Sequence, residues 1–148
     1  GAGFFAKALL NKFERVIGID WDKFAIAAAK ENATEKETYI AGDVEEELQK
    51  VGAVHPNRPP MDDIDPGRLR SIAPTTIIVD PPATGLSGNV RRAIVDLAPT
   101  TLIYVSCNPA TLARDLKDLQ EKFTIDSVTP LDMFPQTAEI EAVAHLQP

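Results

Sequence analysis

The single cysteine of the chain lies where a thiol can act as a nucleophile. Cys107 follows the strand-like run 101–105, and Asn108 and Pro109, which come next, are typical of a helix N-cap and a first helical residue. The partial positive charge of a helix N-terminus stabilises a thiolate, the reactive form of cysteine. This placement predicts a nucleophile, and a buried structural cysteine stays open as the alternative.

Two carboxylates could share in this chemistry. Asp80 ends the apolar run 75–79, and the two prolines after it stop the strand and present the carboxylate at the sheet edge where α/β proteins bind ligands. Methyltransferases acting on exocyclic amines often place an aromatic residue after such a D-P-P, and Ala83 here argues against amine methylation. Glu139 and Glu141 lie on either side of the apolar residue Ile140, so both side chains would point to the same side of the last strand. A solvated face is the alternative, chiefly for Glu139.

A third constellation could hold a nucleotide-like ligand. Residues 1–6, G-A-G-F-F-A, fit G-x-G-x-x-A ahead of a helix, so Gly1 and Gly3 would let the backbone approach a ligand closely. Asp20, at the end of the next strand, could accept hydrogen bonds from ribose hydroxyls. Asp43, after the following strand, could reach an adenine amino group, or it could simply cap a helix. The glycine pattern suits NAD, FAD or S-adenosylmethionine, or a tight strand-to-helix turn.

Strand-like and helix-like segments alternate along the chain, which predicts an α/β fold with a mainly parallel sheet. Strands are expected over residues 15–19, 37–41, 75–79 and 101–105, and helices over residues 4–13, 22–32, 44–49, 87–97 and 109–122. Residues 123–131 and 139–146 could pair as a final antiparallel hairpin. A glycine turn normally follows the first, central strand of such a sheet, and here it opens the chain, so we expect the first strand to be missing.

The length of 148 residues suits one domain, which we expect over residues 1–148 with a truncated N-terminus. Residues 52–74 are rich in proline and aspartate and are expected to form a surface loop insertion.

The composition bounds the classes of function. With 15 Lys+Arg against 22 Asp+Glu, the net charge is −7, so the surface as a whole should repel nucleic acid. One cysteine excludes an internal disulfide, and with two distant histidines it excludes a conventional zinc site, so no metal is expected. No apolar run approaches the roughly 18 to 20 residues of a membrane span, and no signal peptide is visible. We therefore expect a cytoplasmic protein.

The string S-C-N-P-A-T-L-A-R-D-L at residues 106–116, together with D-M-F-P-Q-T-A-E-I-E at residues 132–141, resembles the S-adenosylmethionine-dependent RNA uracil-5-methyltransferases. The resemblance covers essentially the whole chain. It implies a Rossmann-like class I S-adenosylmethionine-dependent methyltransferase sandwich, mostly parallel with a C-terminal antiparallel hairpin, as the C-terminal catalytic portion of a larger enzyme. The family usually has arginine where this chain has Ala83, so a guanidinium that would hold the loop or an RNA phosphate is absent.

The resemblance implies methyl transfer from S-adenosylmethionine to C5 of a uridine in tRNA or ribosomal RNA. Cys107 would add to C6 as thiolate, Glu141 would remove the C5 proton, and Asp80 would orient the uracil. Five residues match the family's cofactor-binding positions: Gly1, Gly3, Asp20, Asp43 and Asp80. The RNA would bind mainly through upstream sequence, so we expect the 148 residues alone to have little or no activity.

Two other functions stay open. Ala83 and the truncation would allow a catalytically inactive methyltransferase-like binding module. A dinucleotide-dependent oxidoreductase could use the glycine turn and Asp20, but it would leave Asp43, Asp80 and Cys107 without a shared purpose.

Overall fold

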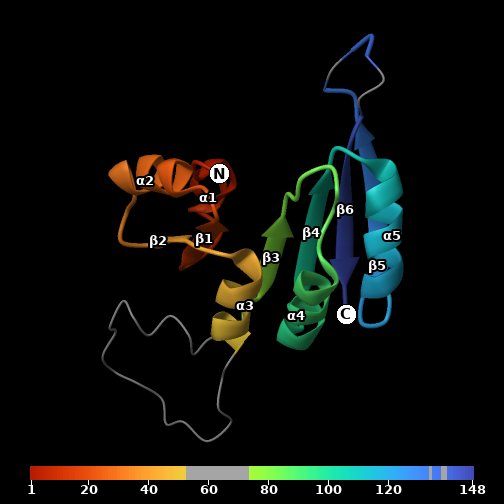
Figure 1. Cartoon of the computed structure of the whole chain (residues 1–148), viewed down its shortest axis with the longest axis horizontal. Helices are drawn as coiled ribbons and strands as arrows, with labels where there is room; N and C mark the ends of the chain where they lie inside the picture. The colour runs from red at the N-terminus through yellow and green to blue at the C-terminus, as the bar shows by residue number, and fades with distance from the viewer. Residues whose placement is uncertain (53–73, 134, 138–139) are drawn as a thin grey trace, which may run out of the picture. The chain divides into compact units, whose positions relative to one another are not determined.

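The chain folds into two compact units, residues 1–50 and 51–148, and each is described by itself. The computed structural model describes residues 1–52, 74–133, 135–137 and 140–148 (Figure 1). Apart from its two end residues, the loop insertion expected at 52–74 lies outside the described residues. Within these ranges no helix is long and apolar enough to cross a membrane.

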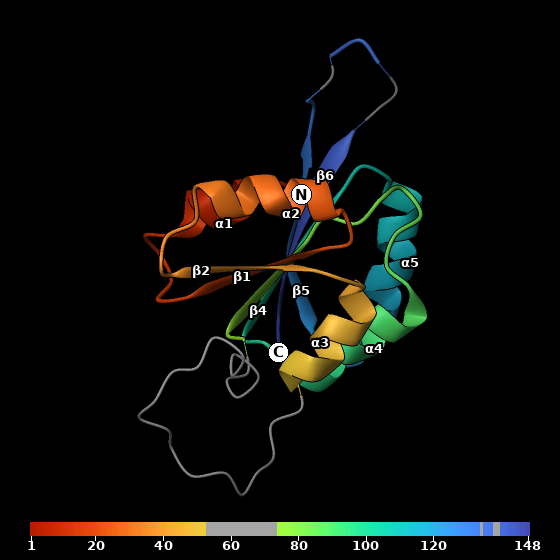
Figure 2. The same ribbon diagram turned by 60° about the vertical axis from the view of Figure 1, so that its left-hand side comes forward.

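The first unit is a two-stranded parallel sheet with α1 and α2 together on one face (Figures 1 and 2). Its elements are α1 (Phe4–Leu9), β1 (Val16–Asp20), α2 (Lys23–Glu31), β2 (Glu37–Ala41) and α3 (Val44–Gly52). The strands pair from Val16 with Glu37 to Asp20 with Ala41. Asp20 therefore lies at the carboxyl edge of this sheet.

Helix α1 is shorter than the predicted 4–13. It ends at Leu9, and a turn closed by the Lys12 amide on the Leu9 carbonyl (2.8 Å) follows. The chain has to reverse before Val16 in order to enter β1, and this reversal stops the helix although apolar Phe13 continues its pattern.

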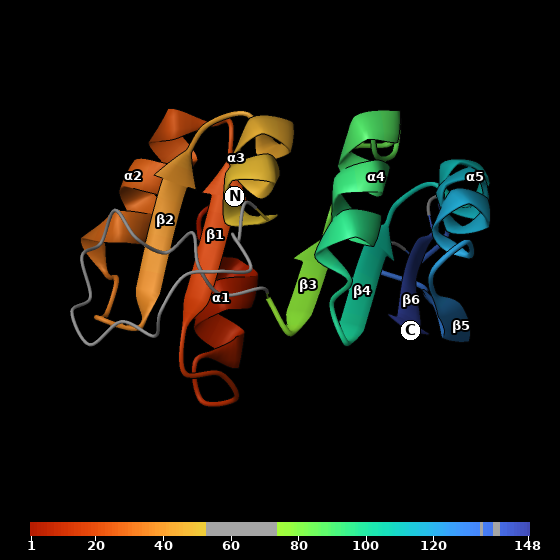
Figure 3. The ribbon, with the colours of Figure 1, turned by 90° about the horizontal axis from the view of Figure 1, so that it is seen from below.

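The second unit is a four-stranded sheet of order β3-β4-β6-β5, with α4 and α5 on one face (Figure 3). Its elements are β3 (Thr76–Val79), α4 (Gly88–Leu97), β4 (Thr101–Ser106), α5 (Pro109–Leu119), β5 (Thr124–Leu131) and β6 (Glu141–Gln147). β3 and β4 are parallel, whereas β6 is antiparallel to both of its neighbours. Buried Tyr104, Leu102 and Leu146 contribute to the core of this unit.

The predicted antiparallel hairpin of β5 and β6 is confirmed, and the structure adds the strand order. The later strand, β6, pairs with β4, and the earlier strand, β5, forms the edge. Ala142, Ala144 and Leu146 of β6 are buried, whereas most of β5 is exposed. β5 also contains Pro130, which cannot donate a ladder hydrogen bond and suits an edge strand.

Within the described ranges both sheets are open: β1 and β2 are the edges of the first, and β3 and β5 are the edges of the second. There, β1 pairs only with β2, and β3 only with β4. The expectation that a first strand is missing stays a prediction.

Candidate active site

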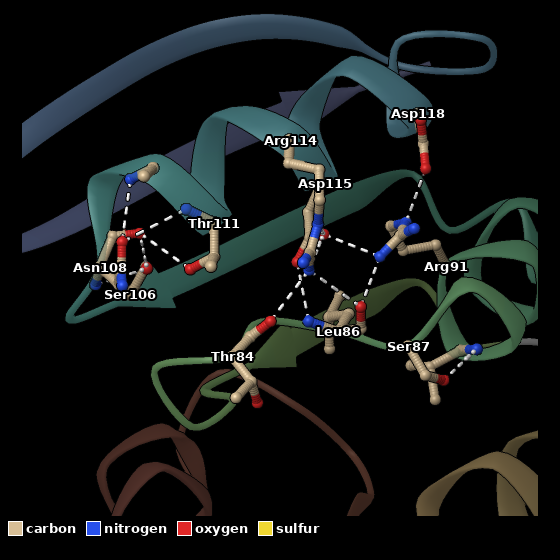
Figure 4. Close-up of polar contacts among 12 residues, drawn as sticks. Thr84, Leu86, Ser87, Arg91, Ser106, Asn108, Thr111, Arg114, Asp115 and Asp118 are labelled. Atoms are coloured by element: carbon tan, nitrogen blue, oxygen red, sulfur yellow. Dashed lines mark hydrogen bonds and ion pairs between the residues drawn. The ribbon is translucent and has the colours of Figure 1, made fainter.

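Cys107 lies exposed between the end of β4 and the start of α5. The Asn108 side chain caps the helix, as predicted, because its Oδ1 accepts hydrogen bonds from the amides of Ala110 (3.0 Å) and Thr111 (3.3 Å) (Figure 4). The Ser106 hydroxyl accepts a hydrogen bond from the Asn108 amide (3.1 Å) and donates one to the Asn108 carbonyl (3.0 Å), which fixes the turn. The exposure excludes a buried structural role for the cysteine.

The register of β4 against β6 brings Cys107 and Glu141 to the same end of this ladder. The last pair of this antiparallel ladder joins Ser106 to Ala142, so the next position along each strand is Cys107 and Glu141. Glu141 is half-buried and also pairs with Leu131 of β5. A thiol and a carboxylate from distant parts of the sequence thus share one edge of the sheet.

Asp80 joins them at the same edge. Val79, the last residue of β3, pairs with Tyr104 of the parallel strand β4, so Asp80 follows the carboxyl end of its strand as Cys107 follows its own. Asp80 is exposed, and partial burial of its carboxyl group raises its pKa above the ordinary value. Glu139, which was expected to share a face with Glu141, lies outside the described residues.

A buried carboxylate that sequence reasoning missed lies beneath the loop that follows Asp80. The side chain of Asp115 on α5 is fully buried. Its carboxylate accepts hydrogen bonds from the Leu86 amide (2.7 Å), Arg91 Nη1 (2.8 Å) and Arg114 Nη2 (2.7 Å) (Figure 4). It also accepts one from the Tyr104 hydroxyl (2.6 Å). Burial alone would raise the pKa of Asp115, but these donors hold it below its ordinary value.

The position of Asp115 was a usable sequence signal. It falls on the apolar stripe of α5, three residues after Leu112 and four before Leu119, both of which are buried. A charged side chain on such a stripe requires partners, because an unpaired buried charge is costly.

Side chains of the same helix also donate hydrogen bonds to the main-chain carbonyls of the loop. Arg114 Nη2 donates to the carbonyls of Thr84 (3.0 Å) and Leu86 (3.3 Å). The Thr111 hydroxyl donates to the carbonyl of Ala83 (3.0 Å). These contacts do not depend on the side chain at position 83, so the loop is held although the family's usual arginine is absent there.

The predicted cofactor residues of the first unit lie at the carboxyl edge of its sheet. Asp20 accepts a hydrogen bond from the Asp22 amide (2.8 Å). Because Ala41 pairs with Asp20 across the parallel ladder, Asp43 follows at the same edge.

Asp43 caps α3, which confirms the simpler alternative for this residue. Its Oδ1 accepts hydrogen bonds from the amides of Glu45 (2.9 Å) and Glu46 (3.1 Å). A contact of Asp43 with an adenine stays a prediction.

The second glycine of the G-x-G pattern has a role within the protein itself. Gly3 has φ of 85°, a conformation that favours glycine, and a Cβ there would lie 2.6 Å from the Tyr39 hydroxyl. The same ring lies over Gly18, where a Cβ would come within 2.7 Å of Tyr39 Cδ1. A Cβ at Gly1 would meet no atom of the described residues within 4 Å. Gly3 thus makes room for Tyr39, and its predicted role in ligand approach is not needed to explain it.

Comparisons with solved structures identify the fold. The chain matches the tRNA (uracil-54, C5)-methyltransferase of Pyrococcus abyssi, solved in complex with S-adenosyl-L-homocysteine, with a TM-score of 0.70 and 30% identity over 99% of this chain and 32% of that one. The N-methyltransferase NodS of Bradyrhizobium japonicum, at 18% identity and a TM-score of 0.62, shares the fold alone. The fold is that of class I S-adenosylmethionine-dependent methyltransferases, as predicted.

Comparison with known sequences identifies relatives among RNA methyltransferases. An uncharacterized RNA methyltransferase of Listeria monocytogenes is 36% identical over 99% of this chain, and one of Clostridium acetobutylicum is 34% identical over 97%. The chain spans 29% of the length of each. The family model described as tRNA (Uracil-5-)-methyltransferase matches residues 1–148. The chain, which brings its exposed Cys107 and Glu141 to one end of a strand ladder, belongs to the tRNA (uracil-5-)-methyltransferase family.

Proposed function

We propose that this chain is the catalytic portion of a longer enzyme that methylates C5 of a uridine in tRNA or ribosomal RNA, with S-adenosylmethionine as methyl donor. Membership of the family supports RNA methylation. The observation that supports the finer proposal is the pairing of Ser106 with Ala142, because Cys107 and Glu141 are the next residues at that end of the ladder. Addition to C6 requires a nucleophile, and removal of the C5 proton requires a proton acceptor, so both groups must lie beside the same uracil ring.

The first unit supplies hydrogen-bond acceptors that suit the ribose and adenine of the methyl donor. The carboxylates of Asp20 and Asp43 lie at one sheet edge, and carboxylate oxygens accept hydrogen bonds from ribose hydroxyls and an adenine amino group. Gly1 and Gly3 are proposed to contribute to the same binding, and the cofactor contact of Asp80 stays a prediction. S-adenosylmethionine supplies an electrophilic methyl group on its sulfonium when it is bound.

The residues of the second unit perform the other steps. The Cys107 thiolate forms a bond to C6 of the uracil, and the electron pair of the C5–C6 double bond moves toward the O4 carbonyl as an enolate. C5 then forms a bond to the methyl carbon, and the pair of the broken carbon–sulfur bond stays on the donor's sulfur. Glu141 takes the C5 proton, the C5–C6 double bond re-forms, and the Cys107 thiolate leaves. Asp80 at the adjoining strand end orients the base.

The test uses the full-length enzyme with S-adenosylmethionine and RNA substituted with 5-fluorouridine. Fluorine at C5 leaves no proton for Glu141 to remove, so the reaction stops at the covalent adduct. We expect a band of reduced mobility on a denaturing gel that is lost in Cys107→Ala and kept in Glu141→Gln. Glu121→Gln, an exposed change on the surface, serves as the matched control.

Separate tRNA and ribosomal RNA arms identify the substrate class. Absence of an adduct with both, while calorimetry shows that S-adenosylmethionine binds, would refute the proposal and favour an inactive binding module. The net charge of −7 supports RNA binding outside this chain, so residues 1–148 alone should methylate RNA weakly or not at all. Full activity of the isolated residues 1–148 would contradict that part of the proposal.

A further inference from the structure

We propose that Arg114 and Asp115 are positioning residues that hold the Asp80 loop, defined as residues 80–86, in place for the reaction. This inference rests on the proposed function, because it assigns these residues to the same site. They do not touch the reacting atoms; they act through the backbone of the loop.

One helix connects the nucleophile to Arg114 and Asp115, the two residues that we call the clamp. Helix α5 begins directly after Cys107 and its cap Asn108, and its second turn carries Arg114 and Asp115. From there Arg114 donates to two carbonyls of the Asp80 loop, and Asp115 accepts the Leu86 amide at its end (Figure 4). The helix therefore fixes the distance between the strand end that carries Cys107 and the loop that begins with Asp80.

The arrangement of charges explains how the clamp stays ordered. The Asp115 side chain is 0% exposed, Arg91 is 15% exposed and Arg114 is 50% exposed. Arg91 also donates to Asp118 of α5 (2.9 Å), so it anchors α4 to the same helix. Deleting Arg114 leaves Asp115 with Arg91, Tyr104 and the Leu86 amide, and the fold should survive. Arg114 can therefore be removed in order to separate positioning from folding.

A purely structural role and a positioning role give different results for Arg114→Ala in the full-length enzyme. Displacing a positioned group by about 1 Å costs on the order of 100-fold in rate. We expect kcat for RNA methylation to fall about 10-fold to 100-fold, with the KM for RNA changed much less, because most RNA contacts are proposed to lie outside this chain. Arg114→Lys keeps one cationic donor and should restore part of kcat.

The second readout follows the loop itself. The Leu86 amide, which donates to the buried Asp115 carboxylate, should exchange with deuterium faster in Arg114→Ala than in the wild type. Thr111→Val, which removes only the hydroxyl contact with Ala83, should have a smaller effect on both readouts. The matched control is Arg92→Ala on α4, since the Arg92 side chain is exposed and makes no hydrogen bond or ion pair with the described residues.

Each outcome decides the proposal. Lower kcat together with faster loop exchange, both absent in Arg92→Ala, supports it. An unchanged kcat in folded Arg114→Ala, or a lost kcat with unchanged loop exchange, overturns it. If Arg114→Ala does not fold, the Arg114→Lys and Thr111→Val variants decide on the same two readouts. A wild type that methylates no RNA refutes the proposed function, whereas the exchange data still report separately whether Arg114 holds the loop.

Discussion

Replacing Gly85 by alanine should disrupt the loop and the buried carboxylate together. Gly85 has φ of 74°, in the left-handed region that alanine rarely adopts. A Cβ at this position would lie 2.5 Å from Asp115 Oδ2 and 2.7 Å from Arg114 Nη2. Oδ2 cannot withdraw freely, because it also accepts hydrogen bonds from the Leu86 amide and the Tyr104 hydroxyl.

The expected loss follows from two costs. The left-handed conformation costs a residue with a Cβ about 1–2 kcal/mol. Overpacking a well-filled site costs about 1–3 kcal/mol more. Gly85→Ala should therefore lower the free energy of unfolding of the second unit by about 2–5 kcal/mol.

Native-state hydrogen exchange of the β4 and β6 amides in the full-length protein measures this quantity. Gly88→Ala is the matched control, because a Cβ at Gly88 meets only Arg91 Nη2, at 3.8 Å, among the described residues. This control should be neutral or up to about 1 kcal/mol more stable, since alanine favours a helix over glycine. Equal stability of the two variants would refute the argument that Asp115 and the backbone conformation require glycine at position 85.

Two further predictions concern other parts of the chain. Hydrogen bonds from Tyr39 and from a nearby backbone amide lower the pKa of Glu37 from 4.5 to about 2, so its contribution to stability is present above about pH 4.5 and is lost as the pH falls toward 2. Carbon NMR of the Glu37 carboxyl group should give a midpoint near 2, and a midpoint near 4.5 would contradict the network. Asn108→Ala removes the cap of α5 and should cost about 1 kcal/mol, measured as faster exchange of the Ala110 and Thr111 amides. Asn108→Asp, which keeps the acceptor, should exchange as the wild type does.

Much of the fold could be predicted because its signals are local. Asn108 with Pro109 marks the start of α5, Ser87 caps α4, and Asp22 caps α2, each through a side chain that bonds amides within three residues. Apolar alternation and continuous apolar runs located the strands to within one or two residues. Such signals depend only on neighbours in the sequence, so they can be recognised without the tertiary structure.

The sequence by itself thus determined the elements, the cap beside Cys107 and, through its motifs, the family. Only the tertiary structure decided that β6 lies between β4 and β5, and therefore that Glu141 and Cys107 come to the same end of one ladder. It also decided that Asp115 is a buried clamp and that Gly3 accommodates Tyr39. Strand order and buried charge depend on which faces are covered by distant residues. Local periodicity reports the pattern of one segment and carries no information about its partner.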